Sequence, residues 1–249
     1  MAQPRKKPRT QPAEDAAKKS VDSLTFRVNS KFKNTKQKDM YKTILDNRIT
    51  FAKGTAGTGK TFIALMAALE CIKNPNIPIS KIMISRQIIE ASSVSLGYLK
   101  GSLDEKTSPY FSIFYDNLAK MIDKDALTYL KSQDRIKEMI VNFVRGATFG
   151  EVDHETGKVT GYVVIIDEAQ NFSKQDMLLI LSRLGENSKI VVLGDPAQQD
   201  LKLKNGEVNG LVDAWDRLNG LDGVGFIEFD EEDIVRDAFL KQIMKRYKV

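Results

Sequence analysis

The stretch Gly54-Thr55-Ala56-Gly57-Thr58-Gly59-Lys60-Thr61 decides the fold of this chain. It fills the pattern G-x-x-x-x-G-K-[ST], follows the apolar run Ile49 to Ala52 and opens a helical run, Lys60 to Lys73. A strand, a glycine-rich loop and a helix in this order are the setting in which the pattern forms a phosphate-binding loop, or P-loop. The alternative is a glycine-rich turn that matches by chance, and the flanking elements argue against it.

Each residue type in the loop has a separate task in binding a triphosphate. Glycines let the loop curl until successive backbone N–H groups point inward and form a nest for anions, and the helix N-terminus adds partial positive charge. We expect the Lys60 ammonium to contact the β and γ phosphates and the Thr61 hydroxyl to bind magnesium. The pattern thus predicts ATP and Mg²⁺ as cofactors, held by Gly54, Thr55, Ala56, Gly57, Thr58, Gly59, Lys60 and Thr61.

A second apolar run, Val163 to Ile166, ends in the acids Asp167 and Glu168. The carboxyl ends of strands in an open parallel sheet face the ligand crevice. We expect Asp167 to hold magnesium through its water shell and Glu168 to orient or deprotonate the attacking water. Taken alone, such a run is equally typical of a strand that ends in solvent; the P-loop upstream favours the catalytic interpretation.

A third apolar run, Ile190 to Leu193, leads into Gly194-Asp195-Pro196-Ala197-Gln198. Its polar end should face the same crevice. The Gln198 amide is suited to bond both the γ phosphate and the attacking water, and so to distinguish a triphosphate. The alternative is a Gly-Asp-Pro turn whose polar groups face solvent.

Strand-like and helix-like segments alternate along the chain. Short runs rich in Ile and Val are typical of strands that are buried on both faces. The alternation predicts a doubly wound α/β fold with a mostly parallel sheet and a RecA-like P-loop NTPase core. The expected strands are Ile49 to Ala52, Ile79 to Ser85, Tyr162 to Ile166, Lys189 to Leu193 and Gly225 to Phe229; the expected helices are Lys60 to Lys73, Tyr110 to Ile122, Asp134 to Phe143, Lys174 to Leu184, Gly210 to Leu218 and Glu232 to Tyr247.

Length and composition favour one main domain in 249 residues. Residues 1–22 carry Arg5, Lys6, Lys7 and Arg9 without apolar periodicity, so we expect a disordered basic tail before an ATPase domain at 23–249, with a hairpin-like insertion at 150–161. The formal charge of +5 permits attraction to nucleic acid. Whether the tail contacts phosphates, acts as a localisation signal or only aids solubility stays open.

Membrane, disulfide and Cys/His metal chemistry are not expected. The sequence has no apolar run of membrane-spanning length and starts with polar, basic residues, which predicts a soluble cytoplasmic protein with no membrane partner. Cys71 is the single cysteine and His154 the single histidine, so any metal within one chain must bind to oxygen ligands.

In their order along the chain, these motifs resemble those of the PhoH family of ATPases, whose core looks like the first motor domain of superfamily 1 helicases. The resemblance runs from about Asn34 to the C-terminal helix and implies the compact single-domain form. The family usually has Arg-Pro where this chain has Arg86-Gln87, and a shorter stretch at 150–161. The matching segments outside the P-loop are Leu96 to Gly101, Glu105-Lys106, Pro109-Tyr110, Tyr115-Asp116, Arg145-Gly146, Asp167 to Asn171, Gly194 to Leu201 and Asp233 to Arg236.

The resemblance implies an adenine contact and a ring of subunits. Gln37 matches the helicase-like glutamine that reads adenine, although a solvated glutamine in a Lys-rich segment fits nearly as well. Hydrolysis usually needs a further cation beside Lys60 and magnesium, and Arg183 and Arg236 are the candidates. The chain has no second motor domain, so we expect a neighbouring subunit, most simply in a hexameric homo-oligomer, to supply this cation. Surface salt bridges are the alternative for both arginines.

The function expected from these features is Mg-dependent ATP hydrolysis coupled to binding or remodelling of single-stranded RNA or DNA. The alternative is an oligomeric ATPase switch that acts on protein partners. A nucleotide kinase is disfavoured because no arginine-rich lid is evident. Aromatic side chains at Tyr98, Tyr110, Phe111, Phe114 and Tyr115 suit either base stacking or core packing at helical spacing.

Overall fold

The computed structural model describes residues 26–28, 31–86, 103–141, 144–204 and 206–246. The predictions for the basic tail, for the Leu96 to Gly101 motif and for Tyr98 lie outside these residues.

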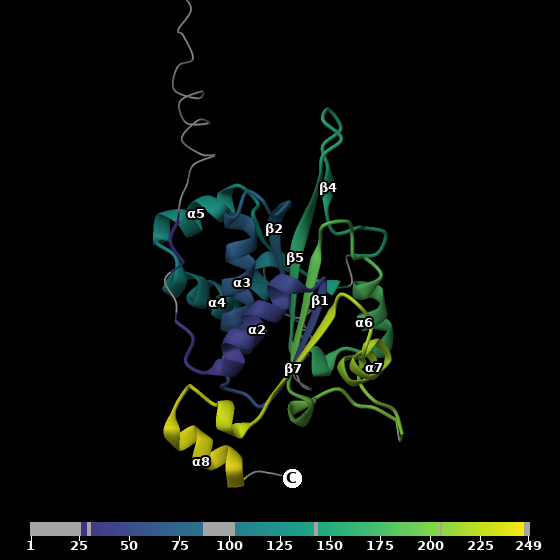
Figure 1. Ribbon diagram of the computed structural model, residues 1–249. Helices are drawn as coiled ribbons and strands as arrows, with labels where there is room; N and C mark the ends of the chain where they lie inside the picture. The colour runs from purple at the N-terminus through teal and green to yellow at the C-terminus, as the bar shows by residue number, and fades with distance from the viewer. Residues whose placement is uncertain (1–25, 29–30, 87–102, 142–143, 205, 247–249) are drawn as a thin grey trace, which may run out of the picture.

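Within the described residues, seven strands form one sheet in the spatial order β3, β2, β5, β6, β1, β7, with β4 paired to β5 (Figure 1). All neighbours are parallel except β4 and β5. The predicted doubly wound α/β fold with a RecA-like core is confirmed. The strands are β1 (Ile49–Gly54), β2 (Ile79–Arg86), β3 (Ile136–Met139), β4 (Glu151–Val152), β5 (Val159–Asp167), β6 (Lys189–Gly194) and β7 (Val224–Phe229).

Helices cover both faces of the sheet because successive strand residues point to opposite sides. Helices α3 and α4 lie on one face of the sheet and α6 and α7 on the other (Figure 1). Ile165 packs into the core with residues of α3 and α4, whereas its neighbour Ile166 packs into the core with residues of α6 and α7. None of the described helices is long and apolar enough to cross a membrane. The helices are α2 (Thr35–Asp46), α3 (Lys60–Lys73), α4 (Leu103–Met121), α5 (Lys124–Ser132), α6 (Lys174–Leu181), α7 (Gly210–Leu218) and α8 (Ala238–Arg246).

The predicted helix Asp134 to Phe143 is wrong. The chain reverses at Asp134, whose φ is +55°, and residues 136–139 form β3 at the edge of the sheet. The apolar residues Ile136 and Met139 are three apart, as in a helix, yet both are buried by strand pairing with β2. The edge of β2 has backbone N–H and C=O groups that need hydrogen-bond partners, and pairing with these groups decides the conformation of residues 136–139 against their helical spacing.

Helix ends follow capping side chains more closely than apolar periodicity. The C-terminal helix begins at Ala238 and not at Glu232, because Asp237 accepts from the N–H groups of Phe239 and Leu240. Helices α2 and α5, which the apolar pattern does not predict, begin after the caps Asn34 and Asp123.

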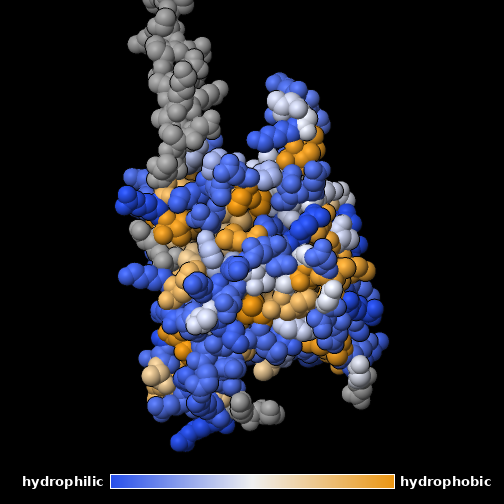
Figure 2. All heavy atoms as spheres, viewed as in Figure 1, coloured by the Kyte–Doolittle hydropathy of each residue, from blue (hydrophilic) through white to orange (hydrophobic). Residues whose placement is uncertain are grey.

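The segment 150–161 pairs β4 antiparallel with the start of β5. Asp153 shapes the turn by accepting from the N–H groups of Glu155 and Thr156. The hairpin projects from the end of the sheet opposite to α8 (Figure 1), and its tip is hydrophilic (Figure 2).

Candidate nucleotide site

The P-loop lies between the end of β1 and the start of α3. Gly59 caps α3 with φ +86°, in the left-handed region that favours glycine. Gly54 has φ +126°, and a Cβ there would lie 1.9 Å from the backbone oxygen of Phe229 on the paired strand β7. Glycine is therefore required for this loop path.

Lys60 is folded back onto the loop. Its Nζ donates to the carbonyl oxygens of Gly54 (2.6 Å) and Thr55 (2.9 Å). Burial lowers the pKa of Lys60, and the charges of Asp195, Asp167 and Glu168 oppose that shift. When a phosphate binds in the loop, the Lys60 ammonium can therefore replace these neutral carbonyl partners with anionic phosphate oxygens.

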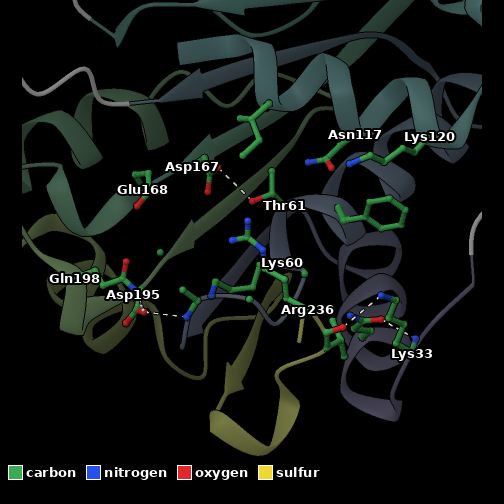
Figure 3. A pocket seen from close by; sticks show the side chains of 18 of the residues that line it. Lys33, Lys60, Thr61, Asn117, Lys120, Asp167, Glu168, Asp195, Gln198 and Arg236 are labelled. Carbon is green, nitrogen blue, oxygen red and sulfur yellow. Dashed lines mark hydrogen bonds between the residues drawn. The ribbon is translucent and has the colours of Figure 1, made fainter. Parts of the chain in front are cut away.

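Thr61 and Asp167 meet beneath the loop. The Thr61 Oγ1 donates to Asp167 Oδ2 at 3.2 Å (Figure 3). Burial raises the pKa of Asp167 to about 6, the neighbouring charge of Glu168 adds to this, and Arg86 and Thr61 oppose it. One hydroxyl and one carboxylate are the oxygen donors that Mg²⁺ takes from protein when phosphates and water complete its shell, so these residues fit a magnesium ion.

The loop binds an anionic oxygen of the protein itself. The Ala56 N–H donates to Asp195 Oδ2 at 3.1 Å, and Gln198 Nε2 donates to the same oxygen at 2.8 Å. Asp195 is buried at the mouth of the loop. A carboxylate oxygen here stands in for a phosphate oxygen and shows that the cradle fits an oxyanion.

Glu168 is bound through both carboxylate oxygens. Arg86 Nη2 lies 2.9 Å from Oε1, and Gln170 Nε2 donates to Oε2 at 2.6 Å. The backbone of Glu168 has φ +54°, which is strained for a residue with a side chain. Gln170 also accepts from the Asp195 N–H at 3.0 Å and so connects Glu168 to the loop after β6.

A cavity of about 500 Å³ contains these groups. In Figure 3, Glu168, Asp195 and Gln198 lie on one side of the Thr61–Asp167 pair, and Asn117 and Lys120 of α4 on the other. The cavity is large enough for a nucleotide. Of the predicted site residues outside the P-loop, it is lined by Gln37, Asp167, Glu168, Gln198 and Arg236.

The remaining predicted residues differ in their placement. Gln37 is 3% exposed, donates to the Thr58 oxygen and accepts from the Lys33 N–H, both at 2.8 Å. Arg236 follows Val235, whose N–H donates to Gly57 O at 3.1 Å in the same chain. Arg183 lies apart: its carbonyl accepts from Phe149 N–H, next to the hairpin and at the other end of the sheet.

Several residues of the site were missed by the sequence interpretation: Arg86, Gln170, Asn117 and Lys120. Asp195 belongs to the segment that was expected to face the crevice, but it had been given no role of its own. Arg86 ends β2 as Asp167 ends β5, so the rule that strand ends face the crevice would have found it. Asn117 and Lys120 carried no motif, because they reach the cavity only through the packing of α4.

The described aromatic residues of the cluster lie in the core or at its margin, where Tyr110 and Tyr115 are partly buried against it. Phe111 and Phe114 are buried in the core beneath α4, as the packing alternative expects. The Tyr115 ring lies under the Lys131 ammonium, 3.8 Å from the ring centroid. Tyr110 lines a second, open cavity beside Arg86 and Glu168.

Comparison with known proteins gives one family. The model of the PhoH-like protein family matches residues 29–248. The PhoH-like protein of Bacillus subtilis is 34% identical over 234 residues, which cover 94% of this chain and 67% of that protein. Protein PhoH of Escherichia coli K12 is 34% identical over 217 residues, which cover 86% of this chain and 57% of that protein. The chain thus spans roughly three fifths of its relatives' length.

Two solved helicase structures are similar in part. The UvsW helicase of bacteriophage T4 aligns with a TM-score of 0.46 and 14% identity, over 88% of this chain and 67% of that one. The Pif1 helicase of Candida albicans aligns with a TM-score of 0.39 and 15% identity, over 81% and 41%.

Proposed function

The chain belongs to the PhoH-like protein family, and from that premise we propose that it binds ATP with Mg²⁺ and hydrolyses the γ-phosphoryl bond. The observation that carries the proposal is the Thr61–Asp167 contact directly beneath a P-loop whose Lys60 lies in the same cavity as Glu168 and Gln198. These residues reach one cavity from the start of α3 and from the ends of two strands, β5 and β6, as phosphoryl transfer requires.

Thr61 and Asp167 hold the magnesium ion in this proposal. When bound, Mg²⁺ neutralises charge on the phosphates and orients them. Lys60 leaves its carbonyl partners for the β and γ phosphates, and the P-loop N–H groups bind the remaining oxygens. Asp195 then gives up the Ala56 N–H to a phosphate oxygen.

Glu168 is the proposed general base. Its carboxylate accepts the proton of the attacking water while Gln198 orients that water. Both side chains line the cavity, and both now bond to protein groups. Hydrolysis therefore requires these partners to be exchanged for water and phosphate.

Gln37 supports the choice of ATP over other nucleoside triphosphates. An amide donates and accepts at once and so matches the N6 and N7 edge of adenine. Each polar atom of the Gln37 amide has one bond to protein, and an amide has capacity for more. The bonds to Thr58 and Lys33 fix the orientation of the amide at the cavity wall.

The wider role that we propose is a cytoplasmic ATPase of a homo-oligomeric ring, coupled to single-stranded RNA or DNA. The net charge of +5 and the open cavity beside Glu168 support this role. If a single strand has no effect on ATP turnover at low salt, the alternative of a switch acting on protein partners is favoured.

The direct test of nucleotide binding is Lys60→Ala. We expect this variant to lose about 10- to 100-fold in ATP affinity, since charge-assisted bonds to phosphate disappear, and to lose turnover; titration calorimetry and phosphate release measure the two. Lys73→Ala is the matched control, because Lys73 is an exposed lysine at the far end of the same helix. A Lys60→Ala protein that binds and cleaves ATP like the parent would refute the proposal.

A further inference from the structure

The carboxylate of Glu168 is restrained in this structure. A guanidinium nitrogen of Arg86 lies 2.9 Å from one oxygen, and the Gln170 amide donates to the other at 2.6 Å. A catalytic water needs a carboxylate oxygen as its acceptor, and both oxygens already have protein donors. The cation on Oε1 is the stronger competitor, because Arg86 and Glu168 carry opposite charges, whereas the Gln170 amide is neutral.

Arg86 stands at the boundary between two cavities. It lines the nucleotide cavity, and it also lines an open groove of about 560 Å³ on the other side of Glu168. Within the described residues, Glu168 is the hydrogen-bond partner of its guanidinium, and the charge of Arg86 also lowers the pKa of Asp167. With five N–H donors in a planar fork, Arg86 retains donors that can bind an anion from the groove.

The remaining groove wall suits a polymer with phosphates and flat bases. Tyr110 contributes a partly buried aromatic ring to the lining, and Asn171 contributes an amide whose nitrogen has no hydrogen-bond partner among the described residues. The Gln199 amide is already committed to Leu201 and Asn209. The residues that line the groove include two carboxylates, Glu168 and Asp200, and one cation, Arg86, so Arg86 is the charged group of this lining that can bind a phosphate.

We propose that the groove binds a single-stranded nucleic acid, and that a phosphodiester group of the strand takes Arg86 away from Glu168. The freed carboxylate oxygen then accepts from water in the nucleotide cavity, and ATP turnover rises. The inference rests on the proposed ATP hydrolysis and adds its regulation: Arg86 restrains the base until a strand is present. Arg86 is thus a positioning residue that acts through Glu168.

The test is Arg86→Ala in the full chain, with ATP turnover measured with and without a single-stranded oligouridylate. We expect the parent to turn over slowly and to be stimulated several-fold, less so as salt rises. The variant should turn over faster than the parent without the strand, by a similar factor, and should gain little when the strand is added. An arginine with only a structural role would not give a faster enzyme on removal.

Further variants serve as controls. Arg217→Ala removes an exposed arginine that pairs with Asp213 on α7, and it should behave as the parent does. Tyr110→Phe keeps the packing of the ring and tests the hydroxyl, whereas Tyr110→Ala should weaken binding of a labelled oligouridylate and raise the concentration needed for stimulation.

Basal turnover in Arg86→Ala equal to or below that of the parent would overturn the restraint. Unchanged stimulation of that variant by the strand would overturn the groove as the strand site. A separate measurement of ATP binding distinguishes these outcomes from failure of the proposed function. If the proposed function were wrong, the parent and Lys60→Ala would bind ATP equally well.

Discussion

Asp167 shows how one buried charge lowers the stability of the folded protein. Its pKa of about 6 lies above the ordinary 3.8, because burial disfavours the charge. Between these values the folded state binds more protons than the unfolded state, so the free energy of unfolding falls as pH rises, and the full cost is present above about pH 6. We expect Asp167→Asn to raise the unfolding free energy of the nucleotide-free protein by about 1–3 kcal/mol near pH 7.5, measured by denaturant titration.

The gain should shrink as pH falls through about 6 and be absent near pH 4, where the parent is also uncharged at this position. Asp153→Asn is the control of opposite sign. N–H groups of Thr156 and Glu155 lower the pKa of Asp153, so removing its charge should not stabilise the protein at neutral pH. If Asp167→Asn were less stable than the parent in the absence of magnesium, the stabilisation of the Asp167 charge by Thr61 and Arg86 would exceed the cost of burying that charge.

Single residues were predictable where the chemistry is local in sequence. The P-loop motif identifies Lys60 and Thr61 as residues of the cavity, and the apolar strand that ends in two acids identifies Asp167. The restraint on Glu168 was not predictable, because Arg86 lies 82 residues away and its pairing depends on the β2–β5 register.

At the scale of elements, the β1–β7 pairing dictates the first residue of the P-loop. Gly54 lies opposite Phe229, whose carbonyl oxygen would be 1.9 Å from an alanine Cβ. Since backbone cannot move aside as a flexible side chain can, we expect Gly54→Ala to reduce the unfolding free energy by about 3 kcal/mol or more and to impair ATP binding. Thermal and denaturant unfolding measure the first effect.

Gly220→Ala separates steric overlap from backbone strain. Gly220 also has a left-handed φ, +81°, but a Cβ at this position would meet nothing within 4 Å. We expect the substitution to cost only about 1 kcal/mol. Equal costs for the two variants would mean that φ, and not contact with β7, governs Gly54.

Elements were predictable where their signals are local and continuous. Helices α3 and α7 begin and end at the predicted residues, since a glycine-rich loop and an Asn209 cap mark their starts. Strand β3 was not predictable, because its strand conformation comes from the edge of β2, about 50 residues earlier in the chain.

At the scale of the whole molecule, both ends of the described chain close on the P-loop. Asn34 Nδ2 donates to Asp233 O at 3.1 Å, and Lys33 Nζ donates to Val235 O at 3.4 Å. These contacts place Arg236 at the cavity of its own chain. Arg183, at the opposite end of the sheet, reaches an ATP site only if it belongs to a neighbouring subunit.

The two arginines therefore predict different results for mixed assemblies. An Arg183→Ala subunit keeps an intact P-loop, and a Lys60→Ala neighbour still carries Arg183, so in a ring the mixture should recover ATP turnover that neither variant has alone. Arg236→Ala mixed with Lys60→Ala should not recover, because no chain then holds both groups. Phosphate release after subunit exchange measures this, with each variant alone as the baseline. Recovery in the second mixture would show that Arg236 acts between subunits, and unchanged turnover of Arg183→Ala alone would remove Arg183 from the mechanism.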